Sequence, residues 1–99
     1  MELISTALPH GWRWVTDARE RLEFEVELER ELPRQHILVG KPARLIARHE
    51  KRDDFLFRTG HREVAQVHLT WAVETDPFFP HAEVHPSLEQ WAKTGGFMK

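Results

Sequence analysis

The chain has no cysteine, no long apolar run and no basic excess, and each absence removes a class of protein. Without cysteine, its 99 residues can form neither a disulfide scaffold nor a thiolate metal site, and the composition suits a reducing cytoplasm. No stretch approaches the roughly 20 apolar residues that a membrane-spanning helix needs. Residues 1–5 lack the basic start and apolar run of a signal peptide, so we expect a cytoplasmic protein with no membrane segment.

Charge and motifs narrow the function further. A formal net charge of −2 argues against general binding to nucleic acid, whose phosphate backbone attracts basic surfaces. No serine or cysteine stands in a recognisable nucleophile motif, and Thr94-Gly95-Gly96 is typical of a helix end rather than of a phosphate-binding loop. We therefore predict no cofactor and no catalytic residue, and we favour a binding protein over an enzyme.

The residues that are present indicate one folded domain over residues 1–99. Hydrophobic residues make up 40% of the chain and charged residues 30%, which is too apolar for a disordered segment. The clearest strand signal covers residues 63–73, where side chains alternate between two faces. The apolar face comprises Ala65, Val67, Leu69, Trp71 and Val73. The other face is mixed and carries the polar residues Gln66, His68 and Thr70.

Residues 16–32 carry both a strand signal and a helix signal. Apolar and acidic residues alternate strictly over residues 22–28, which is a strand pattern. Asp17 with Glu20 resembles a helix capping box, the residues that follow have good helix propensity, and Pro33 supplies a stop. We predict a helix, because a lone strand explains neither the length of the segment nor its caps.

Two shorter strands, residues 43–49 and 54–58, precede the strand at residues 63–73. Their connections of about four residues are typical of an antiparallel meander. Ser87-Leu88-Glu89-Gln90 is a capping-box pattern that predicts a short last helix. The predicted fold class is therefore α+β: an N-terminal helix, a three-stranded antiparallel meander and a short C-terminal helix. We expect the first helix to cover one face of the sheet.

Several short sequence motifs of the chain resemble those of a group of short bacterial proteins. They are Val67-His68-Leu69-Thr70-Trp71, Glu74-x-Asp76-Pro77 and Ser87-Leu88-Glu89-x-Trp91. In that group an acidic N-terminal helix also precedes a strand of the form Asp-Asp-Phe/Val-Leu-Phe, here residues 53–57. The resemblance spans residues 17–93 and implies a bacterial origin. It implies no activity and supplies no catalytic residue.

One candidate site is a polar patch on the sheet. Gln66, His68 and Thr70 share one face of their strand, and Arg44 and Arg48 of the first strand are expected beside them. Such a patch would bind a carboxylate or a phosphate. The alternative is a structural histidine that is hydrogen-bonded beneath a helix or loop, and we favour that alternative because buried polar groups normally find partners.

A second candidate site is a metal centre. His81, Glu83 and His85 would share one side of an extended segment, and imidazole and carboxylate are suitable ligands for zinc or iron. Pro86 disfavours a helix at His85, and His68 would complete a histidine-rich site. The simpler interpretation, which we favour, is a set of polar loop residues.

Charge is distributed unevenly along the chain. Residues 17–31 hold seven acidic residues and three arginines, a net charge of −4, whereas residues 41–52 hold five Lys or Arg and one Glu, a net charge of +4. One interpretation is two solvated faces. The more specific interpretation is an acidic helix that docks on a basic partner, as inhibitors of nucleases and other toxins often do. Its acidic side chains include Glu20, Glu23, Glu27 and Glu31.

The sequence thus predicts a small protein-binding module, of which an immunity or antitoxin-type protein is one concrete form. A small-ligand or metal-binding protein that uses the region of His68, His81, Glu83 and His85 is the alternative. We expect a protein partner, no membrane and no nucleic acid. Self-association would follow if Phe78 and Phe79 are exposed, because large apolar patches usually mark interfaces.

Overall fold

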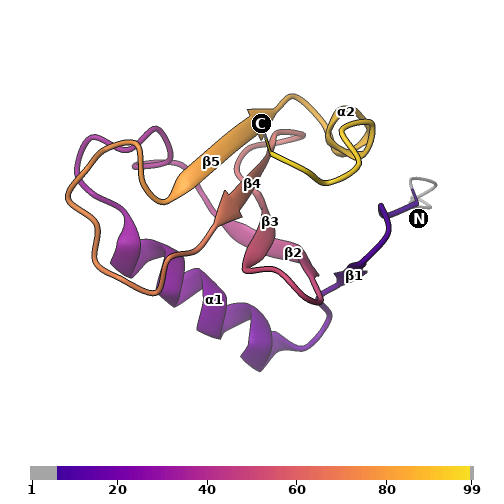
Figure 1. Ribbon diagram of the computed structural model, residues 1–99, viewed down its shortest axis with the longest axis horizontal. Helices are drawn as coiled ribbons and strands as arrows, with labels where there is room; N and C mark the ends of the chain where they lie inside the picture. Colours follow the sequence, from indigo (N-terminus) through magenta and orange to yellow (C-terminus); the bar gives the residue numbers. More distant parts are fainter. Residues whose placement is uncertain (1–6, 99) are drawn as a thin grey trace.

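The computed structural model describes residues 7–98 as an α+β fold with a five-stranded antiparallel sheet (Figure 1). The strands lie in chain order across the sheet: β1 (Trp12–Trp14), β2 (Arg44–His49), β3 (Asp54–Arg58), β4 (Val64–His68) and β5 (His81–His85). The helices are α1 (Ala18–Glu31) and α2 (Leu88–Ala92). Within residues 7–98 neither helix is long or apolar enough to cross a membrane. The expectation for residues 1–5 lies outside the described part.

The predicted three-stranded meander between two helices is wrong, because the sheet has a further strand at each edge. β1 precedes α1 and pairs with β2, and β5 follows the predicted last strand and pairs with β4. β1 has three residues, too few for an alternating pattern to show. β5 lies between Pro80 and Pro86, in a stretch where the prolines indicated a loop.

The strand predicted over residues 63–73 is also too long. β4 ends at His68, so Trp71 and Val73 lie beyond it with exposed fractions of 46% and 67%. The Trp71 ring makes edge contacts with two phenylalanine rings of the core under α1. The backbone N–H groups of Thr70 and Trp71 donate to the side chain of Glu31 and not to a neighbouring strand. A contact with α1 therefore ends the sheet pairing, although the alternating pattern continues in the sequence.

The helix predicted over residues 16–32 is confirmed by α1. Asp17 Oδ1 accepts hydrogen bonds from two backbone N–H groups of the first turn, at 2.8 and 3.4 Å. These bonds satisfy donors that every helix start leaves unpaired. At the other end, Leu32 is the C-cap and the chain leaves the helix before Pro33. The predicted last helix is likewise found in α2, where Ser87 Oγ accepts from the N–H of Gln90 at 3.2 Å.

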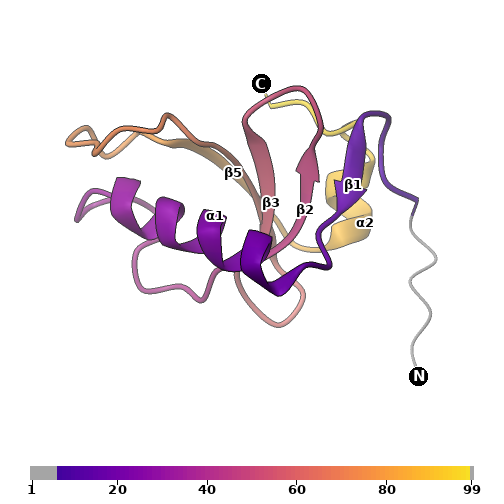
Figure 2. The same ribbon diagram turned by 90° about the horizontal axis from the view of Figure 1, so that it is seen from below.

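The sheet is covered on both faces, with α1 and α2 on opposite sides (Figures 1 and 2). The core under α1 contains Val15, Phe24, Leu28, Leu38, Leu45, Phe55, Phe57, Ala65, Val67 and Leu69. The core under α2 contains Trp12, Ala47, Leu56, Val64, Leu88 and Trp91. β3 serves both cores because alternate side chains of a strand point to opposite faces. Binding sites are therefore expected at the edges of the sheet, at the ends of its strands and in the loops.

Trp91 closes the core under α2 and is completely buried. Truncating such a side chain removes its buried apolar area and leaves a cavity, so Trp91→Ala should lower the free energy of unfolding by about 3–5 kcal/mol. Lys93→Ala, at an exposed position in the same segment, should change it by less than about 0.5 kcal/mol. Urea unfolding measures both. Equal stabilities of the two variants would contradict the packing of α2 on the sheet.

Candidate functional site

The connection between β4 and β5, residues 69–80, presents four large apolar side chains to solvent, and we call it the aromatic loop. Its exposed side chains are those of Trp71, Val73, Phe78 and Phe79. Phe78 is 79% exposed, the highest value among the exposed large hydrophobic residues of the described part. Single exposed apolar residues are ordinary, but four in one loop form a patch of the kind that marks an interaction site.

A buried carboxylate holds the start of the aromatic loop. Glu31, the last residue of α1, is completely buried. Its Oε1 accepts from Thr70 N at 2.8 Å and from Thr70 Oγ1 at 3.0 Å, and its Oε2 accepts from Trp71 N at 2.7 Å. Trp71 has a φ of 61°, which is unfavourable for a bulky residue and persists only when the surroundings fix it. The bonds to Glu31 provide that constraint.

The ionisation of Glu31 is shifted by its surroundings. Burial raises the pKa of its carboxyl above the ordinary value of 4.5, the neighbouring Glu27 carboxyl raises it further, and the bonds from the aromatic loop oppose the shift. Glu31 also sits at the C-terminal end of α1, where the helix dipole disfavours negative charge. A carboxylate at this position is costly in free energy, but it supplies hydrogen-bond acceptors for the backbone of the aromatic loop.

A buried histidine holds the end of the aromatic loop. His36 Nε2 donates to the carbonyl oxygen of Pro80 at 2.7 Å, and His36 Nδ1 accepts from Leu38 N at 3.1 Å. A carbonyl can only accept, so the ring proton is on Nε2. This bond ties the aromatic loop to the connection at residues 32–43, and both segments lie at the same end of the molecule (Figures 1 and 2).

The tip of the aromatic loop is a turn organised by Asp76. Its Oδ1 accepts from Phe78 N at 2.9 Å, and its backbone oxygen accepts from Phe79 N at 3.0 Å. The loop contains two acidic residues, Glu74 and Asp76, and no Lys, Arg or His. The apolar patch is therefore fixed at its start, tip and end, and its own charge is negative.

The four acidic residues predicted to face a partner have different roles. Glu20 pairs with two arginines and Glu27 with one. Hydrogen bonds from these arginines hold the pKa of both carboxyls below the ordinary value. Glu31 is buried under the aromatic loop. Glu23 is exposed and forms no ion pair within residues 7–98, so much of the acidic charge on α1 is already balanced inside the chain.

The five residues predicted to form a polar patch are not brought together. Gln66 is buried beneath α2, and Thr70 belongs to the aromatic loop. Arg48 lies on the opposite face, where its guanidinium stacks on two phenylalanine rings of the α1 core. Arg44 is exposed at the far end of β2. His68 remains exposed on the α2 side of the sheet.

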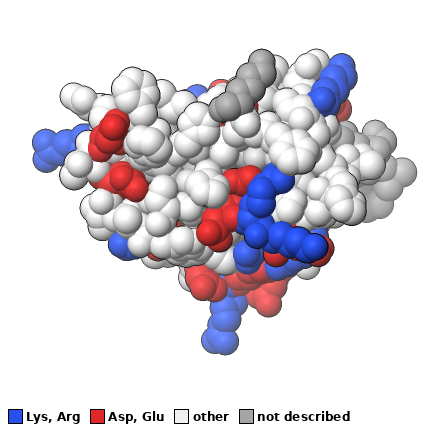
Figure 3. Space-filling model, viewed as in Figure 1, with Lys and Arg blue, Asp and Glu red and all other residues white. Residues whose placement is uncertain are grey.

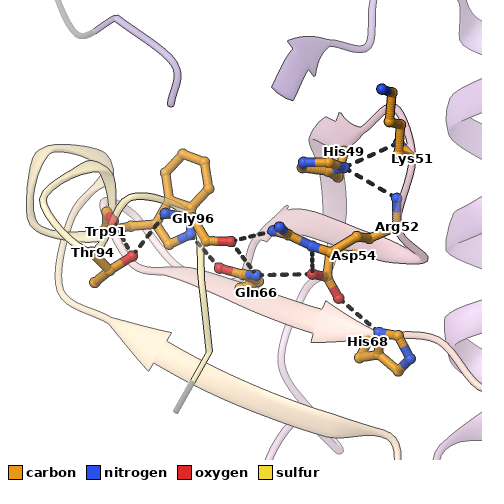
Figure 4. A network of polar contacts seen from close by, with 9 residues as sticks. All are labelled: His49, Lys51, Arg52, Asp54, Gln66, His68, Trp91, Thr94 and Gly96. Carbon is orange, nitrogen blue, oxygen red and sulfur yellow. Dashed lines mark hydrogen bonds and ion pairs between the residues drawn. The ribbon is translucent and has the colours of Figure 1, made fainter. Parts of the chain in front are cut away.

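His68 belongs to a polar network that joins the sheet to the C-terminal segment (Figure 4). Its Nδ1 lies 2.7 Å from Oδ1 of the buried Asp54, whose Oδ2 accepts from Arg52 Nε at 2.7 Å. Arg52 and Gln66 both donate to the backbone oxygen of Gly96, at 2.6 and 2.9 Å. Asp54 orients the imidazole and leaves Nε2 available for a single metal bond.

The residues predicted to bind a metal share one face of β5. His81 Nε2 lies 4.0 Å from Glu83 Oε2, and His85 Nε2 lies 3.8 Å from Glu83 Oε1. His68 is the register partner of His81 across the pair of β4 and β5. Even so, residues 7–98 contain no group of three or more His, Cys, Asp or Glu residues placed to hold a metal ion.

Comparison with known proteins gives no relative to argue from. No family model matches the chain, and no match was found among curated proteins or among solved structures. The function is therefore argued from the aromatic loop itself. The sequence analysis noted Phe78 and Phe79, but it placed Trp71 in a strand and treated Glu31 as a surface residue. The adjacent phenylalanines between prolines were the available signal; the role of Glu31 depends on a contact between distant segments.

The raised pKa of Glu31 predicts how stability depends on pH. The folded protein holds this proton more tightly than the unfolded chain, so the contribution is fully present below pH 4.5 and is lost as pH rises through the folded-state pKa. Glu31→Gln removes the titration. The stability difference between wild type and Glu31→Gln, measured by urea unfolding, should therefore be most favourable to wild type in acid and shrink toward neutrality. The exposed control Glu29→Gln should leave the wild-type profile unchanged, and a pH-independent difference for Glu31→Gln would contradict the assignment.

Proposed function

We propose that this is a cytoplasmic protein-binding module that docks through the aromatic loop on another protein, with an immunity or antitoxin-type role as its most specific form. The observation that carries the proposal is Phe78, which is 79% exposed in a loop whose start is held by a buried carboxylate. A chain that only needed a folded core would gain nothing from this arrangement. Burying the carboxylate is costly, and the loop that it holds displays apolar side chains to water.

The geometry of the loop supports docking because the apolar side chains are presented on a fixed backbone. Aromatic residues carry much of the binding energy in protein interfaces. Ordering a loop during binding consumes part of that energy, and a loop that is already held avoids the loss. The contacts of Glu31 and His36 with the two ends of the aromatic loop provide such a hold.

The charge around the loop supports a basic partner. The aromatic loop contributes two acidic residues and no basic one, and Glu23 and Glu29 of α1 are exposed without an ion pair among the described residues. Figure 3 shows this end of the molecule as a mostly uncharged surface that carries acidic side chains and, at its margin, basic ones. Complementary charge at the rim of an interface accelerates association and makes it sensitive to salt. We therefore propose a partner surface with an apolar recess and a basic rim.

A small-ligand or metal site at His68 is the second candidate. One observation favours it: Asp54 orients the His68 imidazole as carboxylates orient metal-binding histidines, and His81 lies opposite on β5. Docking is preferred because the described residues supply no third ligand there. A rise in melting temperature with added Zn²⁺ that His68→Ala abolishes would favour this second candidate.

Phe78→Ser tests docking through the aromatic loop. Loss of an interface hot spot costs about 2 kcal/mol or more, so the Kd of the partner complex should rise roughly thirtyfold. The melting temperature should stay the same, because the ring contributes little to the core. Affinity purification from the native host followed by calorimetry with the recovered protein makes the measurement.

Leu22→Ser is the matched control, because Leu22 is also a largely exposed apolar residue but lies on α1, outside the aromatic loop. It should leave the Kd unchanged, and added salt should weaken the wild-type complex. Recovery of the wild-type protein without a partner at any salt concentration would count against the proposal. A partner that binds Phe78→Ser and wild type equally well would refute the assignment to this loop.

A further inference from the structure

β5 is the longer of the two edge strands of the sheet. Strand order gives it a single neighbour, β4, and its five register pairs with β4 run without a shift from His81 to His85. The outer side of an edge strand offers a regular row of backbone donors and acceptors to any further strand. β1, at the opposite edge, has three residues and offers a much shorter row.

The edge at β5 lacks three of the usual protections against strand addition, although the strand is short and carries the charged Glu83. Natural edge strands are blocked by lysine, by an internal proline or by a bulge. The sequence of β5, His-Ala-Glu-Val-His, contains no lysine and no proline, and its pairing with β4 contains no bulge. Pro80 and Pro86 flank the strand and confine any added pairing to this short segment.

We propose that β5 is a homodimerisation edge, on which a second copy of the chain adds its own β5 antiparallel, with the two-fold axis through Val84. This axis places Glu83 of each copy opposite His85 of the other, a complementary pair formed twice, and places the two Val84 side chains together on the other face. An axis through Glu83 would set two carboxylates opposite each other. An axis through Ala82 would bring together two alanine side chains, which offer less apolar area than two valines.

The surface beside β5 has room and apolar area for the second strand. Val84 is 37% exposed and Phe97 is 63% exposed. A cleft of about 560 Å³ lies between the strand and the C-terminal segment, lined by Glu83, Val84, His85, Thr94, Phe97 and Met98. A stable dimer normally buries at least about 1,200 Å², more than a short strand pair provides alone. Self-pairing at β5 therefore also buries Phe97, and it gives a weak dimer that dissociates on dilution.

Single-cysteine variants test the register directly, because the natural chain has no cysteine. In Val84→Cys the two thiols meet at the two-fold axis, so mild oxidation should produce a covalent dimer. Lys51→Cys, at an exposed position in the turn between β2 and β3, should stay a single chain under the same conditions. Light scattering should show the wild-type mass rising from one chain to two with concentration, whereas Val84→Lys should stay at one chain. Circular dichroism and the melting temperature verify that each variant is folded.

Three results would overturn the proposal: wild type that stays a single chain at every concentration, Val84→Lys that dimerises as wild type does, or Lys51→Cys that cross-links as readily as Val84→Cys. A monomer whose β5 amide resonances shift when an unrelated extended peptide is added would assign the edge to a foreign strand, which also overturns self-pairing. Phe78→Ser should dimerise as wild type does, so failure of the docking proposal and failure of this one are distinguishable.

Discussion

The contact of Glu31 with the backbone of Thr70 and Trp71 is the constraint on which the arrangement of the aromatic loop, the proposed docking surface, depends. It forms where α1 ends, it takes the backbone N–H groups that would have continued the pairing of β4, and it sets the direction in which the aromatic loop leaves the sheet. An apolar side chain at position 31 would satisfy none of these donors. The Glu31 carboxylate therefore links the C-terminal end of α1, the end of β4 and the direction in which the aromatic loop leaves the sheet.

The two covered faces of the sheet explain why the proposed docking surfaces lie at its periphery. α1 covers one face through Phe24 and Leu28, and α2 covers the other through Trp91, whose indole N–H is accepted by the buried Gln66 at 2.8 Å. A sheet that is covered on both faces has no broad open face for a ligand. What remains is a loop with exposed aromatic rings at one end and a strand with a single neighbour at one edge, and we propose both as sites of contact with proteins.

The elements that could be predicted are those whose signals are local. Asp17 and Ser87 cap their helices, and the run around Phe55 indicated β3 with its observed bounds. β1 and β5 were missed because one is very short and the other is half exposed between prolines, so neither carries an apolar pattern. The end of β4 was missed because its cause, Glu31, lies far away in the sequence. The same distance hid the role of this carboxylate, which looks like any other acidic residue of an acidic helix.

Amide hydrogen exchange at Thr70 and Trp71 is the most direct test that the aromatic loop is held in place before any partner binds. If their N–H groups are bonded to the buried Glu31 carboxylate, both amides should exchange nearly as slowly as those in the centre of β4, because exchange then requires extensive unfolding. Exchange as fast as that of the exposed Thr75 in the same loop would show a mobile segment and would contradict the account.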